Sequence, residues 1–339
     1  MKNKKIILII MLLFMVSGCT KQLKTANNEI VKNDVTGQTL TGNILCQPEN
    51  QVTIDKYNET LENNKKIYQE QLDKKEITQK QFDKKMDSLI DIKELPKCGE
   101  ISVVSGGYEG IWTTVFVKPL AWLILTIGKV VKNYGLAVIL LTLLIRLCLY
   151  PVTKKTAMQS EKMAEVKPEM AKIEAKYKDK TDQQSMMMKS QETMLLYKKH
   201  QINPISGCIF ALIQIPLFFA FYEALNRLPV IFEGKFLSLQ LGNTAGTALS
   251  KGQFQYLIIV ALVILVTYFS TKLNKTAAMD KEQAKTMGMM SNVMIVMISI
   301  ASFTVSTSIA LYWISNSAFT IFQNLLVKRG RKDVKIIKN

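Results

Sequence analysis

An arginine lies inside one of the most apolar runs of the chain, which extends from Leu136 to Pro151. In the hydrocarbon of a membrane, a central arginine costs about 2.5–3.5 kcal/mol on insertion scales. Arg146 must therefore reach the interface, pair with another side chain or face water. It lies about 7.5 Å of helix before Pro151, so snorkelling to the interface is the simpler interpretation of this run alone. Facing a wet cavity inside the membrane is the functional alternative.

The composition is that of a chain in which apolar spans alternate with charged segments. Hydrophobic residues make up 48% and charged residues 21%, and the two kinds are segregated into separate stretches. We expect an all-α polytopic membrane protein with five transmembrane helices. These cover about residues 133–152, 204–225, 254–273, 287–302 and 306–327. Their lengths are near the roughly 20 residues that a ~30 Å hydrocarbon core requires.

The N-terminus has the pattern of an export signal. A basic start, Met1 to Lys5, precedes an apolar run from Ile6 to Val16 and then Ser17-Gly18-Cys19. Because small residues lead directly to a cysteine, the pattern resembles a bacterial lipobox, and it predicts a lipoprotein signal peptide over 1–18 with lipidation of Cys19. A plain secretory signal is the alternative. Either one places the mature N-terminus outside the cytoplasm.

The distribution of basic residues predicts the orientation of the spans. Segment 153–203 carries eleven lysines, 274–286 carries three, and the tail 329–339 is basic, whereas 226–253 has only Arg227, Lys235 and Lys251. The positive-inside rule makes the first three segments cytoplasmic. An odd number of spans that begins with an exported N-terminus also ends with the C-terminal tail in the cytoplasm. Residues 108–132, with Trp112 and Trp122, are expected to form an interfacial helix, and a full span is the alternative.

The exported segment 19–107 is predicted to be a lipid-anchored tether followed by a small helical part. Residues 20–50 are polar, and helical periodicity begins at Ile54 and continues to Ile92. Thr78 with Gln81 three residues later predicts a capping box that opens a second short helix. Cys46 and Cys98 bracket this region, and whether they form a disulfide is open.

Segment 153–203 is predicted to be a cytoplasmic helical hairpin. A charged helix from Lys154 to Tyr177 precedes a turn with Thr181 or Asp182 as the cap, and a second helix follows from Gln183 to His200. Both carry methionines at helical spacing. These side chains either form an adaptable binding surface or bury each other between the two helices.

Polar residues recur within the apolar spans. Gln214 lies beside Pro216, and the last span carries a polar stripe at helical spacing: Ser308, Tyr312, Ser315, Asn316, Thr320 and Gln323. Each alone is explained by hydrogen bonding between helices. A stripe of four turns, together with Gln214 and Arg146, favours one shared polar cavity.

Several motifs resemble those of the YidC/Oxa/Alb family of membrane protein insertases, in particular its Gram-positive lipoprotein members. They are Leu144-Ile-Arg146 with Tyr150-Pro151, Lys167-Pro168-Glu169, Tyr197 to Pro204, Gly207-Cys208, Gln214-Ile-Pro216, Phe221-Tyr222 and Ala310-Leu-Tyr312-Trp313. The resemblance covers about residues 110–328. It implies an insertase core over 108–328, with five spans around a groove that opens to the cytoplasm.

The resemblance also implies the residues of the groove. Arg146 matches the family's groove arginine, and Gln214, Tyr312 and Trp313 match groove or substrate-contact positions. We assign Asn316, from the polar stripe, and Ser270, where many relatives have a glutamine, to the same groove.

The implied function is insertion and folding of newly made membrane proteins in a bacterial plasma membrane, alone or with the Sec translocon. Partners are nascent membrane proteins, the lipid bilayer and, by family, the ribosome, with no other nucleic-acid binding. No enzyme, metal or cofactor motif is present in the sequence. A small-anion transporter that uses Arg146 is the alternative. It predicts internal repeats, and the sequence has none that we recognise.

Overall fold

The computed structural model describes residues 20–338 except 106, 204–205 and 274–280, and it does not describe the side chains of 206–213, 281–287 and 331–338. The predicted signal peptide and Cys19 lie outside the described residues. The chain divides into two compact units. The first unit comprises Met1–Leu141, Pro216–Ile259 and Phe303–Tyr312. The second unit comprises Thr142–Ile215, Val260–Ser302 and Trp313–Asn339.

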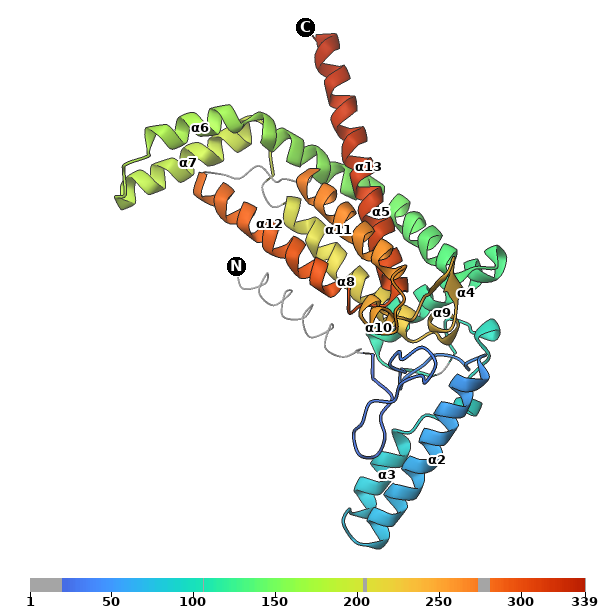
Figure 1. The fold of residues 1–339 in the computed structure, drawn as a ribbon. Coiled ribbons are helices and arrows are strands. Elements are labelled where there is room, and N and C mark those ends of the chain that lie inside the picture. The colour runs from blue at the N-terminus through green and yellow to red at the C-terminus, as the bar shows by residue number, and fades with distance from the viewer. Residues whose placement is uncertain (1–19, 106, 204–205, 274–280, 339) are drawn as a thin grey trace. The chain divides into compact units, whose positions relative to one another are not determined.

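The fold is almost entirely helical, as predicted (Figure 1). The α-helices are α2 (Gln51–Asp73), α3 (Gln79–Asp87), α4 (Lys118–Val131), α5 (Tyr134–Glu165), α6 (Lys167–Lys176), α7 (Gln183–Lys199), α8 (Ser206–Asn226), α9 (Pro229–Phe232), α10 (Ala245–Ser250), α11 (Tyr256–Leu273), α12 (Lys281–Ala301) and α13 (Thr307–Lys338). The other elements of the described residues are short 3₁₀ helices η1 (Ile92–Glu94) and η2 (Cys98–Glu100), the π-helix η3 (Thr113–Val117) and a two-stranded antiparallel ribbon, β1 (Lys235–Phe236) with β2 (Leu239–Gln240).

Residues 20–50 are folded and do not form the free tether that we expected. The backbone amide of Leu23 donates to the carbonyl of Leu40 at 2.8 Å, and that of Val31 donates to Leu23 at 2.9 Å. The buried side chains of these three residues pack in one cluster with Tyr57 and Phe232. The segment looked like a tether because its few apolar residues follow no strand or helix period. They are enough for folding because α2 and the α9 region supply the rest of the core.

The small helical part of the first unit agrees with the sequence. Helices α2 and α3 lie side by side (Figure 1). Thr78 and Gln81 form the predicted capping box at the start of α3. Cys46 and Cys98 are joined by a disulfide, with their Cα atoms 4.8 Å apart. The bond links the N-terminal segment to the end of the helical part.

The structure divides the predicted helix from Lys154 to Tyr177 and joins its first part to the helix of the first span. Helix α5 continues through Pro151 to Glu165, and the break comes at Val166. A proline removes one helical hydrogen bond but does not always end a helix. The break falls instead just before Lys167-Pro168, since a proline disfavours helical backbone in the residue that precedes it.

The rest of the hairpin follows the prediction. Asp182 caps α7, and its carboxylate accepts from the amide of Ser185 at 2.8 Å. Helices α6 and α7 pack side by side (Figure 1). The hairpin core contains Met163, Val166, Met170, Leu196, Tyr197 and Ile202.

By length and composition, three helical segments among the described residues can cross a membrane: Thr113–Val131, Tyr134–Glu165 and Tyr256–Leu273. Gly288–Ala301 is apolar but shorter. Thr113–Val131 falls in the segment that we expected at the membrane interface. Its length and composition allow both an interfacial helix and a full span. The count of five spans therefore stays a prediction. Helix α13 extends to Lys338, so the predicted tail continues the last helix.

A second buried arginine, which sequence analysis treated only as a loop charge, organises the first unit. The Arg227 side chain is 2% exposed and forms ion pairs with Glu223 at 3.1 Å and Glu109 at 2.5 Å. Its Nε donates to the carbonyl of Asn43 at 2.6 Å, and Trp112 Nε1 donates to Glu223 at 3.0 Å. This network joins the N-terminal segment, the start of the 113–131 helix and the end of α8.

We expect Arg227→Leu to lower the free energy of unfolding by about 3–5 kcal/mol, because it leaves a buried carboxylate without its partner. Thermal unfolding of the purified full-length chain in detergent measures this loss. The control is Lys235→Leu, an exposed cation in the same loop region, with a change within about 0.5 kcal/mol. Equal melting of the two variants would contradict the structural role of Arg227.

Burial also raises the pKa of the Glu233 carboxyl, although its Oε2 accepts from the amides of Glu49 at 3.0 Å and Asn50 at 3.2 Å. The folded chain therefore binds this proton more tightly than the unfolded chain. Stability contributed by Glu233 is then lost as pH rises from the ordinary glutamate range through the raised pKa.

Glu233→Gln should remove this loss, so the variant should gain stability over the wild type as pH rises from 4 to 8. Melting temperatures across that range test the sign. Glu49→Gln, which changes an exposed neighbouring carboxyl, is the control. If Glu233→Gln instead loses stability relative to the wild type as pH rises, the folded chain favours the charged carboxylate of Glu233.

Candidate functional site

Arg146 lies within the second unit and is 2% exposed. Its Nε donates to Asn316 Oδ1 on α13 at 2.5 Å, and its Nη2 donates to Gln214 Oε1 on α8 at 2.8 Å. The side chain therefore points into the helices and not along α5 toward the interface, and the snorkelling interpretation is wrong. Three residues that the sequence predicted to share a site are in direct contact.

The two amides that hold Arg146 are neutral. A guanidinium stays protonated in proteins, so these hydrogen bonds orient the charge without cancelling it. In sequence, α5 up to Pro151, α11, and α13 up to Val327 contain no aspartate or glutamate. The only acidic residue of α8 is Glu223, which pairs with Arg227 in the first unit. Arg146 therefore contributes a positive charge and hydrogen-bond donors to this site.

Further polar side chains are buried in the same unit. The Thr153 hydroxyl lies 2.9 Å from Gln323 Oε1, and Trp313 Nε1 donates to the Thr267 hydroxyl at 3.2 Å. Gln323 belongs to the predicted stripe, but sequence analysis missed Thr153 and Thr267. Helical spacing is the signal that could have found them, because Thr153 lies seven residues after Arg146 and Thr267 lies three before Ser270.

The other predicted site residues are Ser270, Tyr312 and Cys19. Ser270 is half-buried on α11, one turn beyond Thr267. Tyr312 is buried in the first unit, where its ring stacks on Phe221 with the ring centroids 4.5 Å apart. In that unit Tyr312 acts as an aromatic packing residue. Cys19 lies outside the described residues.

The methionines of the hairpin divide into two groups. Met163 and Met170 are buried in the hairpin core. The second group lies exposed on α7 and consists of Met186, Met187, Met188 and Met194, with Leu195 beside them. Both interpretations of the sequence thus apply, to different methionines; Met158 on α5 is also exposed. Helix α7 presents an adaptable apolar surface.

Among the described residues, no group of three His, Cys, Asp or Glu side chains could hold a metal ion. What Arg146, Gln214 and Asn316 offer together is a fixed positive charge and amide groups. Such groups bind and orient a charged or polar segment.

Comparison with known proteins identifies the chain. The 60Kd inner membrane protein family matches residues 126–335, more than half of the sequence. The membrane protein insertase YidC of Oceanobacillus iheyensis is 35% identical over 243 residues, which cover 69% of this chain and 91% of that protein. The insertase MisCA of Bacillus subtilis is 37% identical, covering 64% of this chain and 79% of its own length.

Among solved structures, an active YidC insertase with its first transmembrane domain resolved matches with a TM-score of 0.46 and 24% identity. The match covers 71% of this chain and about half, 49%, of the length of that one. Residues 20–107 precede the range that the family matches.

The family match over most of the helical part and the similarity to insertases along most of their length lead to one conclusion. The chain belongs to the YidC/Oxa family of membrane protein insertases, close to its homologues in Gram-positive bacteria.

Proposed function

We propose that Arg146 is the transient partner of acidic residues in nascent membrane proteins while their hydrophilic ends cross the bilayer. The observation that supports this is a buried guanidinium held by two neutral amides, Gln214 and Asn316. A buried charge attracts an opposite charge more strongly than an exposed one does, because solvent screens it less. The attraction is temporary and makes no covalent bond.

The barrier to insertion is loss of water by the polar end of the client. Its backbone and charged groups cannot be satisfied in hydrocarbon. In our proposal, the Arg146 cluster lines a polar groove that opens to the cytoplasm and shortens the dry part of the path. Trp313 and Ser270 contribute to the same groove. The client's apolar helix then moves sideways into lipid, and its burial supplies the driving force.

The proposed topology has five spans, with segment 19–107 outside the cytoplasm and the hairpin and basic tail inside. The lysine distribution supports it. The interfacial position of residues 108–132 belongs to the same proposal. The exposed methionines of α7 would then contact apolar client segments as they arrive. The Sec translocon and the ribosome are proposed partners on the basis of family membership.

Arg146→Ala should reduce insertion of clients with acidic translocated ends by about tenfold or more and leave neutral clients less affected. Arg146→Lys should retain part of the activity, because it keeps the charge but not the two-point hydrogen bonding. Protease accessibility of newly made clients, after depletion of the native protein and complementation, measures this. Normal insertion of acidic clients by Arg146→Ala would refute the proposed role.

Asn316→Asp separates charge from structure. The aspartate keeps the shape and the hydrogen bond to Arg146 but neutralises the guanidinium. We expect it to impair acidic clients nearly as much as Arg146→Ala, with no loss of melting temperature.

The matched control is Gln323→Glu, on the same helix and about 10.5 Å further along it. Gln323 is bonded to Thr153 rather than to Arg146, so acidic clients should be inserted almost normally. If Asn316→Asp and Gln323→Glu impair insertion equally, the cause is any added negative charge on α13 and not neutralisation of Arg146.

The N-terminal anchor has its own test. We propose that Cys19 is lipidated and that the signal peptide is removed before it. Mass spectrometry of the mature N-terminus should find a diacylglyceryl cysteine, and Cys19→Ser should abolish it. An unmodified N-terminus after cleavage at another site would identify a plain secretory signal.

A further inference from the structure

Trp313 and Thr267 form a hydrogen bond between two helices of the second unit. The indole Nε1 of Trp313, on α13, donates to the hydroxyl oxygen of Thr267, on α11, at 3.2 Å. Thr267 is only 4% exposed, whereas Trp313 is half-buried. The hydroxyl is therefore enclosed by the packed chain, while part of the indole surface stays accessible.

Trp313 lies one helical turn before the residue on α13 that contacts Arg146. Asn316 follows Trp313 by three residues, and its Oδ1 accepts from Arg146 Nε at 2.5 Å. Residues three apart in a helix lie on one face. The indole therefore belongs to the same face of α13 that contacts the guanidinium.

The bond to Thr267 decides which part of the indole is left for binding. Tryptophan has an apolar ring and one N–H group, which can only donate. Because Nε1 of Trp313 donates to Thr267, the surface that remains is the apolar ring. The same bond restrains the ring, since a different side-chain rotamer would lose the acceptor.

We propose that Thr267 is a positioning residue for membrane protein insertion. Its hydroxyl holds the Trp313 indole so that the ring meets the apolar helix of a client, one turn along α13 from the contact with Arg146. This rests on the proposed function, in which Trp313 contributes to the groove. It adds that a residue of another helix fixes the indole, and that the indole contacts the apolar part of a client rather than its charged end.

Two variants of Thr267 separate the hydrogen bond from the shape of the side chain. Thr267→Val replaces the hydroxyl with a methyl group, which an apolar helix accommodates without loss of folding. It should slow insertion about threefold, the factor that an average hydrogen bond between membrane helices represents. Acidic and neutral clients should be affected alike, because both carry an apolar helix. Thr267→Ser keeps the hydroxyl and should restore most of the rate, measured by protease accessibility of newly made clients.

A double-variant cycle shows whether Thr267 acts through the indole. Trp313→Phe removes the N–H group and keeps an aromatic ring. If Thr267 acts through that group, adding Thr267→Val to Trp313→Phe causes no further loss. Two losses that add up would show that Thr267 acts elsewhere, and they would overturn the proposal.

The restraint on the indole has a spectroscopic signature of its own. Fluorotryptophan can replace all three tryptophans of the full-length chain, and fluorine NMR in detergent then observes each indole. The resonance that disappears in Trp313→Phe belongs to Trp313. It should be narrow in the wild type, broadened or displaced in Thr267→Val, and returned to the wild-type position by Thr267→Ser.

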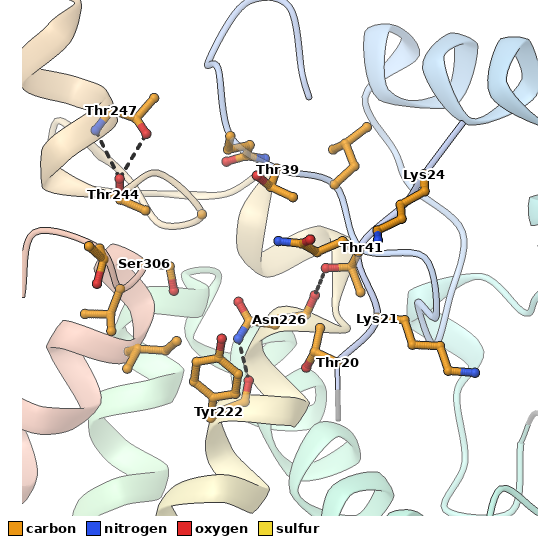
Figure 2. Close-up of a pocket in the computed structure, with 17 residues that line it drawn as sticks. Thr20, Lys21, Lys24, Thr39, Thr41, Tyr222, Asn226, Thr244, Thr247 and Ser306 are labelled. Atoms are coloured by element: carbon orange, nitrogen blue, oxygen red, sulfur yellow. Dashed lines mark hydrogen bonds between the residues drawn. The ribbon is translucent and has the colours of Figure 1, made fainter. Parts of the chain in front are cut away.

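Thr41→Val is the matched control. Thr41 is another buried threonine, and its hydroxyl donates to the backbone carbonyl of Asn226 at 2.8 Å within the first unit, as Figure 2 shows. The control therefore loses a buried hydroxyl that has no indole partner. Its Trp313 resonance and its insertion rates should stay close to those of the wild type.

Normal insertion by Thr267→Val, or an unchanged Trp313 resonance in that variant, would overturn the proposal. So would a defect confined to acidic clients, because it would indicate a disturbed Arg146 rather than a misplaced indole. None of these results removes the proposed role of Arg146, which depends on the selective loss of acidic clients in Arg146→Ala.

Discussion

The cost of removing a guanidinium from water governs this structure. The chain buries two arginines to nearly the same degree and holds them with different partners. Arg227 is paired with the carboxylates of Glu223 and Glu109, so its charge is cancelled and the group holds the first unit together. Arg146 donates to the neutral amides of Gln214 and Asn316, which orient its guanidinium without bringing an opposite charge. The first arrangement is typical of a structural ion pair, and the second supports the anion-attracting role that we propose.

This contrast relates stability to the function that we propose. Burying an arginine is costly, and the surrounding helices supply hydrogen bonds that make the cost tolerable. In our proposal, a client carboxylate pairs with Arg146 for a time and leaves when the client's apolar helix finds lipid. Arg227 could not take this part, because its charge is already paired within the first unit.

Much of the fold and of the candidate site followed from local patterns. The helical class, the capping box at Thr78 and the cap at Asp182 depend on residues within one turn of each other, which a sequence displays directly. Contacts made across long separations were not accessible in this way. The folding of residues 20–50 depends on Phe232, and the role of Arg227 depends on Glu109. Neither partner can be identified from spacing.

By itself, the sequence determined that the chain alternates apolar helices with basic segments, that Arg146 needs a special environment, and that the chain is similar to membrane protein insertases. Hydropathy, charge and motifs are properties of short stretches, so they can be recognised without a structure. Only the tertiary structure decided which acceptors hold Arg146, that α5 continues through Pro151, and that Glu109 pairs with Arg227. These features arise where separate segments meet, because burial and hydrogen bonding are properties of the packed chain.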